Sequence, residues 1–146
     1  MSVGTRIVVV DDDRMLLAIV ARVFVAQGFA VRAFAEPQRA LESVLEEPPD
    51  VLLSDCRMPG MSGPELCRSV RERLGTERPF MILWTGDRAH LDADGKRAAD
   101  VTLDKPTPMA ELVRLIERRA RVRRRRISGV QPRHGAGVVD PREETG

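Results

Sequence analysis

The chain has 146 residues, of which 42% are hydrophobic and 32% are charged. This composition fits one soluble globular domain with a single core, and it excludes a wholly disordered chain. The apolar run near the start spans only Ile7–Val10, and no later run approaches transmembrane length, so we expect a cytoplasmic protein. The two cysteines, Cys56 and Cys67, form no CxxC unit, and we expect both to be free thiols.

The net charge of +2 conceals two oppositely charged parts. Residues 1–116 carry 15 basic and 18 acidic side chains, a balance of −3, whereas residues 117–146 carry 9 basic and 4 acidic, a balance of +5. The basic run Arg121–Arg126 has two interpretations. We favour the solvated end of a helix, where cations suit the helix dipole. The other interpretation is an electrostatic footprint for nucleic acid or an acidic partner, although no helix-turn-helix or zinc-finger motif accompanies the run.

Five short apolar runs predict the strands of a sheet. They lie at Ile7–Val10, Phe29–Phe34, Val51–Leu53, Phe80–Trp84 and Val101–Leu103. Several are rich in β-branched residues and nearly unbroken, which is typical of a parallel sheet with both faces covered.

Helical patterns lie between these runs. Asp13 is the expected cap of a first helix whose apolar face consists of Leu16, Ile19, Val20, Val23 and Phe24. Later apolar faces consist of Leu41, Val44 and Leu45, then Leu66, Val70 and Leu74, and finally Met109, Leu112, Val113 and Ile116. Residues 87–100 offer only Leu91 and alanines, so we expect a short or irregular fourth helix there. The alternation predicts an α/β fold, a parallel sheet with helices on both faces.

Beyond Ile116 the helical pattern of apolar residues is lost, although the arginine run is expected to continue the helix for a few turns. The Gly/Pro-rich residues after it lack periodicity and predict a flexible segment. We therefore divide the chain into an N-terminal arm (1–5), one domain (6–120) and a basic, flexible C-terminal tail (121–146).

Reactive side chains follow the predicted strands, at the edge where open parallel sheets bind their ligands. They are Asp11, Asp12 and Asp13 after the first strand, Asp55 after the third, Thr85 at the end of the fourth and Lys105 after the fifth. Carboxylates brought close together need a hard cation such as magnesium to neutralise them. A carboxylate can also attack phosphorus, and positive charge on the phosphoryl oxygens assists that transfer.

Lys105 is one of only two lysines among 24 basic residues, which suggests a position where arginine would not serve. A hydroxyl such as that of Thr85 can donate a further hydrogen bond to a phosphoryl group.

With these residues in place, the chain resembles the receiver domain of bacterial two-component response regulators, including the single-domain chemotaxis type, over roughly residues 5–120. Four segments carry the resemblance, in order and at nearly the family's spacing. They are VVVDDD (8–13), LLSDCRMPGMSG (52–63), WTG (84–86) and DKP (104–106). The resemblance implies a flavodoxin-like doubly wound sheet of five parallel strands in the order 2-1-3-4-5.

The resemblance also implies the roles of individual residues. Asp55 would be the phosphoacceptor for a histidine kinase, a phosphotransfer protein or a small phosphodonor. Asp11, Asp12, Asp55 and the backbone carbonyl of Arg57 would bind Mg²⁺, with Asp11 acting through water. Thr85 and Lys105 would hold the phosphoryl oxygens, and the Lys105–Pro106 bond would be cis.

Three features depart from the family pattern and concern the output surface. Thr102 stands where many receivers carry Tyr or Phe as a rotamer switch. The spacing from Thr85 to Lys105 is about two residues short, within the weak fourth helix. Arg57 and Asp87 occupy the positions two residues after Asp55 and Thr85.

Two functional hypotheses follow. The first is a signalling switch that binds an unidentified protein partner when phosphorylated, with no enzymatic activity beyond its own phosphorylation and slow dephosphorylation. The second is a regulator that acts on nucleic acid through the arginine-rich run. In the first, activation would shift the segment 86–100, because it has few apolar anchors.

Overall fold

The computed structural model describes the backbone of residues 4–86 and 91–129, and their side chains as far as Arg121. Five parallel strands form one sheet in the order β2-β1-β3-β4-β5. They are β1 (Arg6–Val10), β2 (Ala30–Phe34), β3 (Val51–Ser54), β4 (Phe80–Thr85) and β5 (Val101–Asp104). The predicted doubly wound fold is confirmed, and each predicted strand lies within one residue of its observed bounds.

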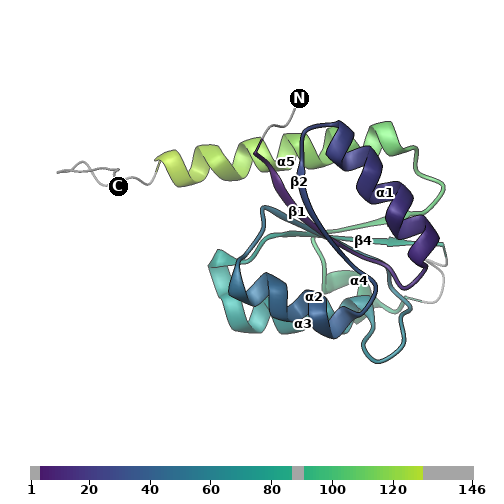
Figure 1. Cartoon of the computed structure of the whole chain (residues 1–146). Helices are drawn as coiled ribbons and strands as arrows, with labels where there is room; N and C mark the ends of the chain where they lie inside the picture. Colours follow the sequence, from purple (N-terminus) through teal and green to yellow (C-terminus); the bar gives the residue numbers. More distant parts are fainter. Residues whose placement is uncertain (1–3, 87–90, 130–146) are drawn as a thin grey trace.

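The helices cover both faces of this sheet (Figure 1). They are α1 (Arg14–Ala26), α2 (Pro37–Glu46), α3 (Gly63–Leu74), the short 3₁₀ helix η1 (Gly75–Glu77), α4 (Ala93–Arg97) and α5 (Met109–Gly129). Helices α1 and α5 share one core with Ile7, Val9 and Ile82, whereas α2, α3 and α4 pack on the opposite face. Adjacent strand residues point to opposite faces, so the nearly continuous apolar runs supply both cores.

The predicted apolar face of α1 is partly wrong. Leu17, Val20 and Phe24 are the buried residues of this helix, whereas Ile19 is 53% exposed. The segment RMLLAIVARVFVA is apolar almost all round, so more than one line of side chains could have faced the sheet. Met15 and Val25 are also exposed, which leaves an apolar outer surface on α1.

The fourth helix is short, as predicted: α4 has five residues. The Asp92 side chain caps it by accepting a hydrogen bond of 2.7 Å from the Gly95 amide. Residues 87–90, which include the noted Asp87, lie outside the described residues.

Helix α5 continues through the arginine run to Gly129, which confirms the predicted extension of the helix and makes residues 121–129 of the C-terminal segment helical. Its buried side chains are Leu112, Val113, Ile116 and Ala120, in agreement with the predicted face. The remainder of the predicted tail, residues 130–146, lies outside the described residues. Within the described part of the chain, no helix combines the length and the apolar composition needed to span a bilayer.

Candidate functional site

The loop between β3 and α3 places Asp55 at the carboxyl edge of the sheet. The Asp55 amide donates to Val10 O at 2.9 Å, and the Gly63 amide closes the loop by donating to Cys56 O at 2.8 Å. A side chain at Gly63 would collide with the Asp55 carbonyl oxygen and approach Leu83 Cδ2 to 2.8 Å. Glycine is therefore required at position 63 because the loop returns so closely on itself.

Three carboxylates meet at this edge, as predicted. Oxygen atoms of Asp11, Asp12 and Asp55 all lie within 4.8 Å of one another. Asp11 is 4% exposed, whereas Asp12 is open to solvent. Asp13 does not join the cluster: its side chain accepts a hydrogen bond from the Leu16 amide and caps α1, which confirms the predicted cap.

Lys105 reaches into the carboxylate cluster from the end of β5. Its Nζ donates to Asp11 Oδ2 at 2.9 Å and lies 3.5 Å from Asp55 Oδ1. Burial would lower the pKa of Lys105, but the hydrogen bond to Asp11 and the charges of both carboxylates outweigh it, so this pKa lies above its usual value. The lysine is therefore held as a cation.

Asp55 is the more exposed of the two acids that pair with this cation, with a side chain 13% exposed against 6% for Asp11. Burial raises the pKa of Asp55, the Lys105 charge opposes that rise, and the Asp11 charge adds to it. Asp55 Oδ1 also accepts a hydrogen bond of 2.8 Å from the Cys56 amide. No hydrogen bond to Asp55 Oδ2 is found among the described residues.

Thr85 is buried at the end of β4, beside the cluster. Its carbonyl accepts a hydrogen bond of 2.8 Å from the Lys105 amide, which ties the ends of β4 and β5 together. The Trp84 indole donates to Asp104 O at 2.9 Å and otherwise packs in the core, as predicted. The structure thus brings Thr85 and Lys105 to the same edge as the carboxylates.

The Lys105–Pro106 bond is trans, so the predicted cis bond is wrong. The trans form is the one that X-Pro bonds favour, by about 0.5–1 kcal/mol. Here it belongs to a turn in which the Thr107 amide donates to Asp104 O at 2.9 Å. Arg57 is exposed in the β3–α3 loop, and its role as a carbonyl ligand stays a prediction.

Both cysteines are free and buried, as expected. Burial raises the pKa of Cys56 to about 11, against an opposing hydrogen bond with Thr85, and the pKa of Cys67 to about 12. Thiols with such high pKa values are poor nucleophiles at neutral pH, so both behave as small apolar core residues.

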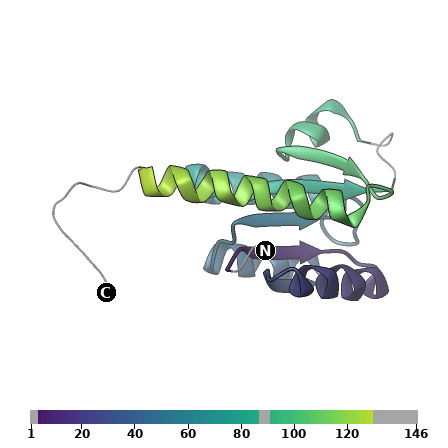
Figure 2. The same ribbon diagram turned by 90° about the horizontal axis from the view of Figure 1, so that it is seen from above.

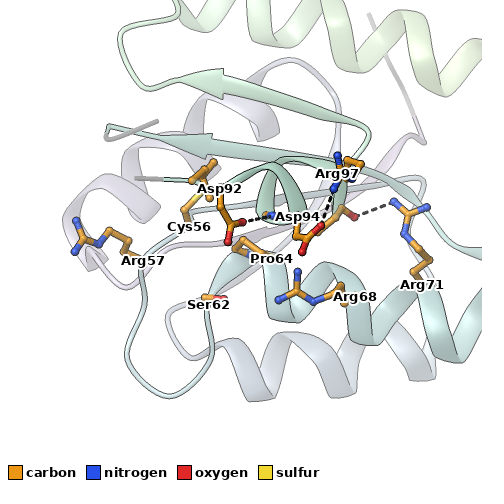
Figure 3. A pocket seen from close by; sticks show the side chains of 12 residues that line it. Cys56, Arg57, Ser62, Pro64, Arg68, Arg71, Asp92, Asp94 and Arg97 are labelled. Atoms are coloured by element: carbon orange, nitrogen blue, oxygen red, sulfur yellow. Dashed lines mark hydrogen bonds and ion pairs between the residues drawn. The ribbon is translucent and has the colours of Figure 1, made fainter. Parts of the chain in front are cut away.

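A groove of about 750 Å³ separates the β3–α3 loop and α3 from α4 (Figure 3). Its lining residues include Cys56, Pro64, Leu91 and Ala98, with Arg57, Arg68 and Arg97 among its charged residues. Across this groove, the Arg71 side chain donates a hydrogen bond of 2.8 Å to Ala98 O, just after α4.

An ion pair that no sequence motif indicates joins the residues just before β4 and β5. Arg78 forms a bidentate pair with Asp100 at 2.8 and 2.9 Å, and Asp100 also accepts from the Met81 amide at 2.8 Å. Burial would raise the pKa of Asp100, but the hydrogen bonds from Arg78 and Met81 outweigh it and hold this pKa below its usual value. This pair fixes the start of β5.

The fold and the site define a doubly wound α/β domain with an acidic, lysine-bearing pocket at the carboxyl edge of its sheet. The chain belongs to the response regulator receiver domain family, whose family model matches residues 7–117. It is thus a receiver domain of the kind found in two-component systems.

Curated relatives agree with this assignment. The chain is 36% identical to the DNA-binding transcriptional regulator NtrC of Proteus hauseri over 115 residues, which are 75% of this chain and 23% of that protein. It is 34% identical to the response regulator MprA of Mycobacterium ulcerans (strain Agy99) over 125 residues, which are 85% of this chain and 53% of that protein. The chain therefore spans only about a quarter and about half of these relatives.

A solved structure with the same fold is the receiver domain of the sensor histidine kinase PA1611 from Pseudomonas aeruginosa PAO1. The two chains are 26% identical, with a TM-score of 0.73, over 80% of this chain and 98% of the other. That structure has a magnesium ion coordinated in its active-site cleft.

Proposed function

We propose that this chain is a phosphorylation-dependent signalling switch of the cytoplasm. Asp55 accepts a phosphoryl group, with Mg²⁺, from a histidine kinase or phosphotransfer protein, and the phosphorylated form changes its affinity for a protein partner. The observation that carries this proposal is the position of Lys105 between Asp11 and Asp55, at 2.9 and 3.5 Å. The chain acts on no other substrate, apart from assisting its own slow dephosphorylation.

The donor set fits magnesium. Three carboxylates at −3 and one ammonium at +1 leave a formal charge of −2 at the cluster of Asp11, Asp12, Asp55 and Lys105. Hard oxygen ligands, one of them open to solvent at Asp12, match what Mg²⁺ prefers, since it keeps several of its waters. When bound, Mg²⁺ supplies positive charge that offsets the carboxylates and the phosphoryl oxygens.

Different residues of the chain have different roles in phosphoryl transfer. Asp55 Oδ2 forms the new bond to phosphorus, while the bond from phosphorus to the donor atom breaks and that atom keeps the electron pair. The Cys56 amide holds Asp55 Oδ1 at 2.8 Å and so orients the carboxylate. Lys105, already a cation, pairs with a phosphoryl oxygen, and the Thr85 hydroxyl donates to another.

The change of state passes through α4 and β5. Thr102 Oγ1 is buried without a hydrogen-bond partner among the described residues, which costs about 1–3 kcal/mol. Thr102 pairs in register with Leu83, and Leu83 shares its core with Ala98 and Ala99 at the end of α4. We propose that α4 shifts into the groove on phosphorylation and that this shift gives Thr102 Oγ1 a partner.

The kinase docks on the outer surface of α1. Met15 and Ile19, 76% and 53% exposed, form an apolar patch in the first turns after Asp12 and Asp13. Contiguous exposed apolar surface marks protein contacts, and Met15 and Ile19 lie about one helical turn apart. A partner seated there lies beside the carboxylate cluster.

Hydrogen exchange of the free and beryllofluoride-bound protein tests the switch. We expect changed protection in residues 91–100, together with protection of the loops at Asp12, Asp55 and Lys105. The Asp55→Asn variant, treated identically, is the control and should show neither change. Changes confined to the three loops, with residues 91–100 unaltered, would contradict the proposed path.

A further inference from the structure

Helix α5 projects beyond the body of the domain (Figures 1 and 2). Its last described buried side chain is Ala120. The Arg119 guanidinium lies 5.1 Å from the ring centroid of Phe80, the first residue of β4, so this contact marks the end of the sheet. From there the helix continues to Gly129.

The charge of α5 is concentrated and mostly of one sign. Eight arginines and two glutamates give this helix a net charge of +6. Arg114, Arg118 and Arg121 are exposed and follow one another at i, i+4 and i+7, which places them on one face. Arg123–Arg126 are four consecutive helical residues, so their backbone positions lie about 100° apart and are distributed all round the axis of the projecting helix.

The helix dipole does not account for this arrangement. Its attraction for cations falls off within the last turn, whereas Arg114 and Arg118 lie more than two turns before Gly129. Like charges at i and i+4, as at Arg114 and Arg118 or at Arg121 and Arg125, oppose helix formation. A bound polyanion would remove that repulsion.

We propose that α5, from Arg114 to Arg126, binds the phosphate backbone of duplex DNA without sequence preference. A helix of about 10–12 Å diameter fits the major groove of about 12 Å width, and a helix that is cationic on all sides can meet phosphates on both walls. The deep, narrow major groove of duplex RNA does not admit such a helix. Residues 1–108, which precede α5, carry 14 basic and 17 acidic side chains, a balance of −3, so the rest of the domain repels DNA and leaves α5 as the contact.

Fluorescence anisotropy with a labelled DNA duplex of random sequence tests this proposal on the full chain. The test variant replaces Arg123, Arg124, Arg125 and Arg126 with Gln. The matched control also introduces Gln and removes the same amount of charge. It replaces four arginines that are exposed on other helices, namely Arg22, Arg39, Arg68 and Arg73. Gln has a helix propensity close to that of Arg, and circular dichroism checks that both variants stay folded.

Wild type and the control should bind with similar affinity, and the test variant should bind at least tenfold more weakly. The slope of log K against log salt should flatten by about 0.9 for each lost phosphate contact, hence by up to about 3.6. If both variants lost DNA affinity equally, the proposal would be overturned, because net charge alone would then explain the binding. Absence of binding by wild type, or tighter binding of duplex RNA or of an acidic peptide, would overturn it as well.

Discussion

Lys105 donates a hydrogen bond of 2.9 Å to Asp11, whereas its distance to Asp55 is 3.5 Å. In this resting arrangement the ammonium group is closer to the proposed metal ligand than to the proposed phosphoacceptor. Lys105 therefore competes with a metal ion for the charge of Asp11, and it must turn toward Asp55 when a phosphoryl group arrives.

Replacing Lys105 with Gln should tighten magnesium binding by about tenfold, because a competing positive charge leaves the cluster. Fluorescence of the single Trp84, which is hydrogen-bonded to the carbonyl of Asp104, reports the titration. Lys96→Gln is the matched control, since Lys96 is the other lysine and is exposed on α4. Equal or weaker magnesium affinity in Lys105→Gln would show that the lysine does not compete.

Removal of Asp12 should act in the opposite direction. We expect Asp12→Ala to weaken magnesium binding roughly tenfold or more, because one of the three converging carboxylates is lost. Asp94→Ala, an exposed acid on α4, removes the same charge away from the cluster and should have little effect. Magnesium affinity unchanged by Asp12→Ala would remove this residue from the ligand set.

Gly63→Ala should destabilise the fold by about 1–3 kcal/mol, the usual cost of overpacking. The added methyl group would meet the Asp55 carbonyl oxygen, which is backbone and cannot rotate away. Gly86→Ala is the control, because a Cβ there meets nothing within 4 Å among the residues that the structure describes and Gly86 has no positive φ. Urea unfolding measures both variants, and equal stabilities would argue against the close approach in the loop.

The ion pair between Arg78 and Asp100 should make part of the stability depend on pH. The pKa of Asp100 is lowered in the folded protein, so its contribution is complete above the unfolded pKa of about 3.9 and is lost as the pH falls through the folded value. Asp100→Asn should therefore cost about 1–3 kcal/mol of unfolding free energy at pH 7. The difference from wild type should shrink below about pH 4. If Asp100→Asn lowered the unfolding free energy by the same amount at pH 3 and pH 7, the ion pair would not be the source of the pH dependence.

The sheet and the cluster at its carboxyl edge could be predicted from the sequence because each depends on a local pattern. Apolar runs such as Val51–Leu53 determine strands that are covered on both faces, and the residues after the strands then meet at one edge. The weak apolar content of residues 87–100 likewise predicted the short α4.

The structural features that could not be predicted from the sequence depend on tertiary contacts. The apolar residues of α1 fit several orientations, and only packing on the sheet distinguishes Leu17, which is buried, from Ile19, which is exposed. The pairing of Arg78 with Asp100 joins residues far apart in the sequence, in a chain that offers many arginines. The isomer of the Lys105–Pro106 bond was inferred from resemblance alone, and that inference was wrong.

Phosphorylation of Asp55 is tested most directly by intact-protein mass spectrometry after incubation with a small phosphodonor and magnesium. Wild type should gain the mass of one phosphoryl group, and Asp94→Asn should gain the same. Asp55→Asn should gain nothing, and wild type with a chelator in place of magnesium should gain little. Equal uptake by Asp55→Asn, or no uptake by folded wild type with magnesium, would contradict the assignment of Asp55 as the phosphoacceptor.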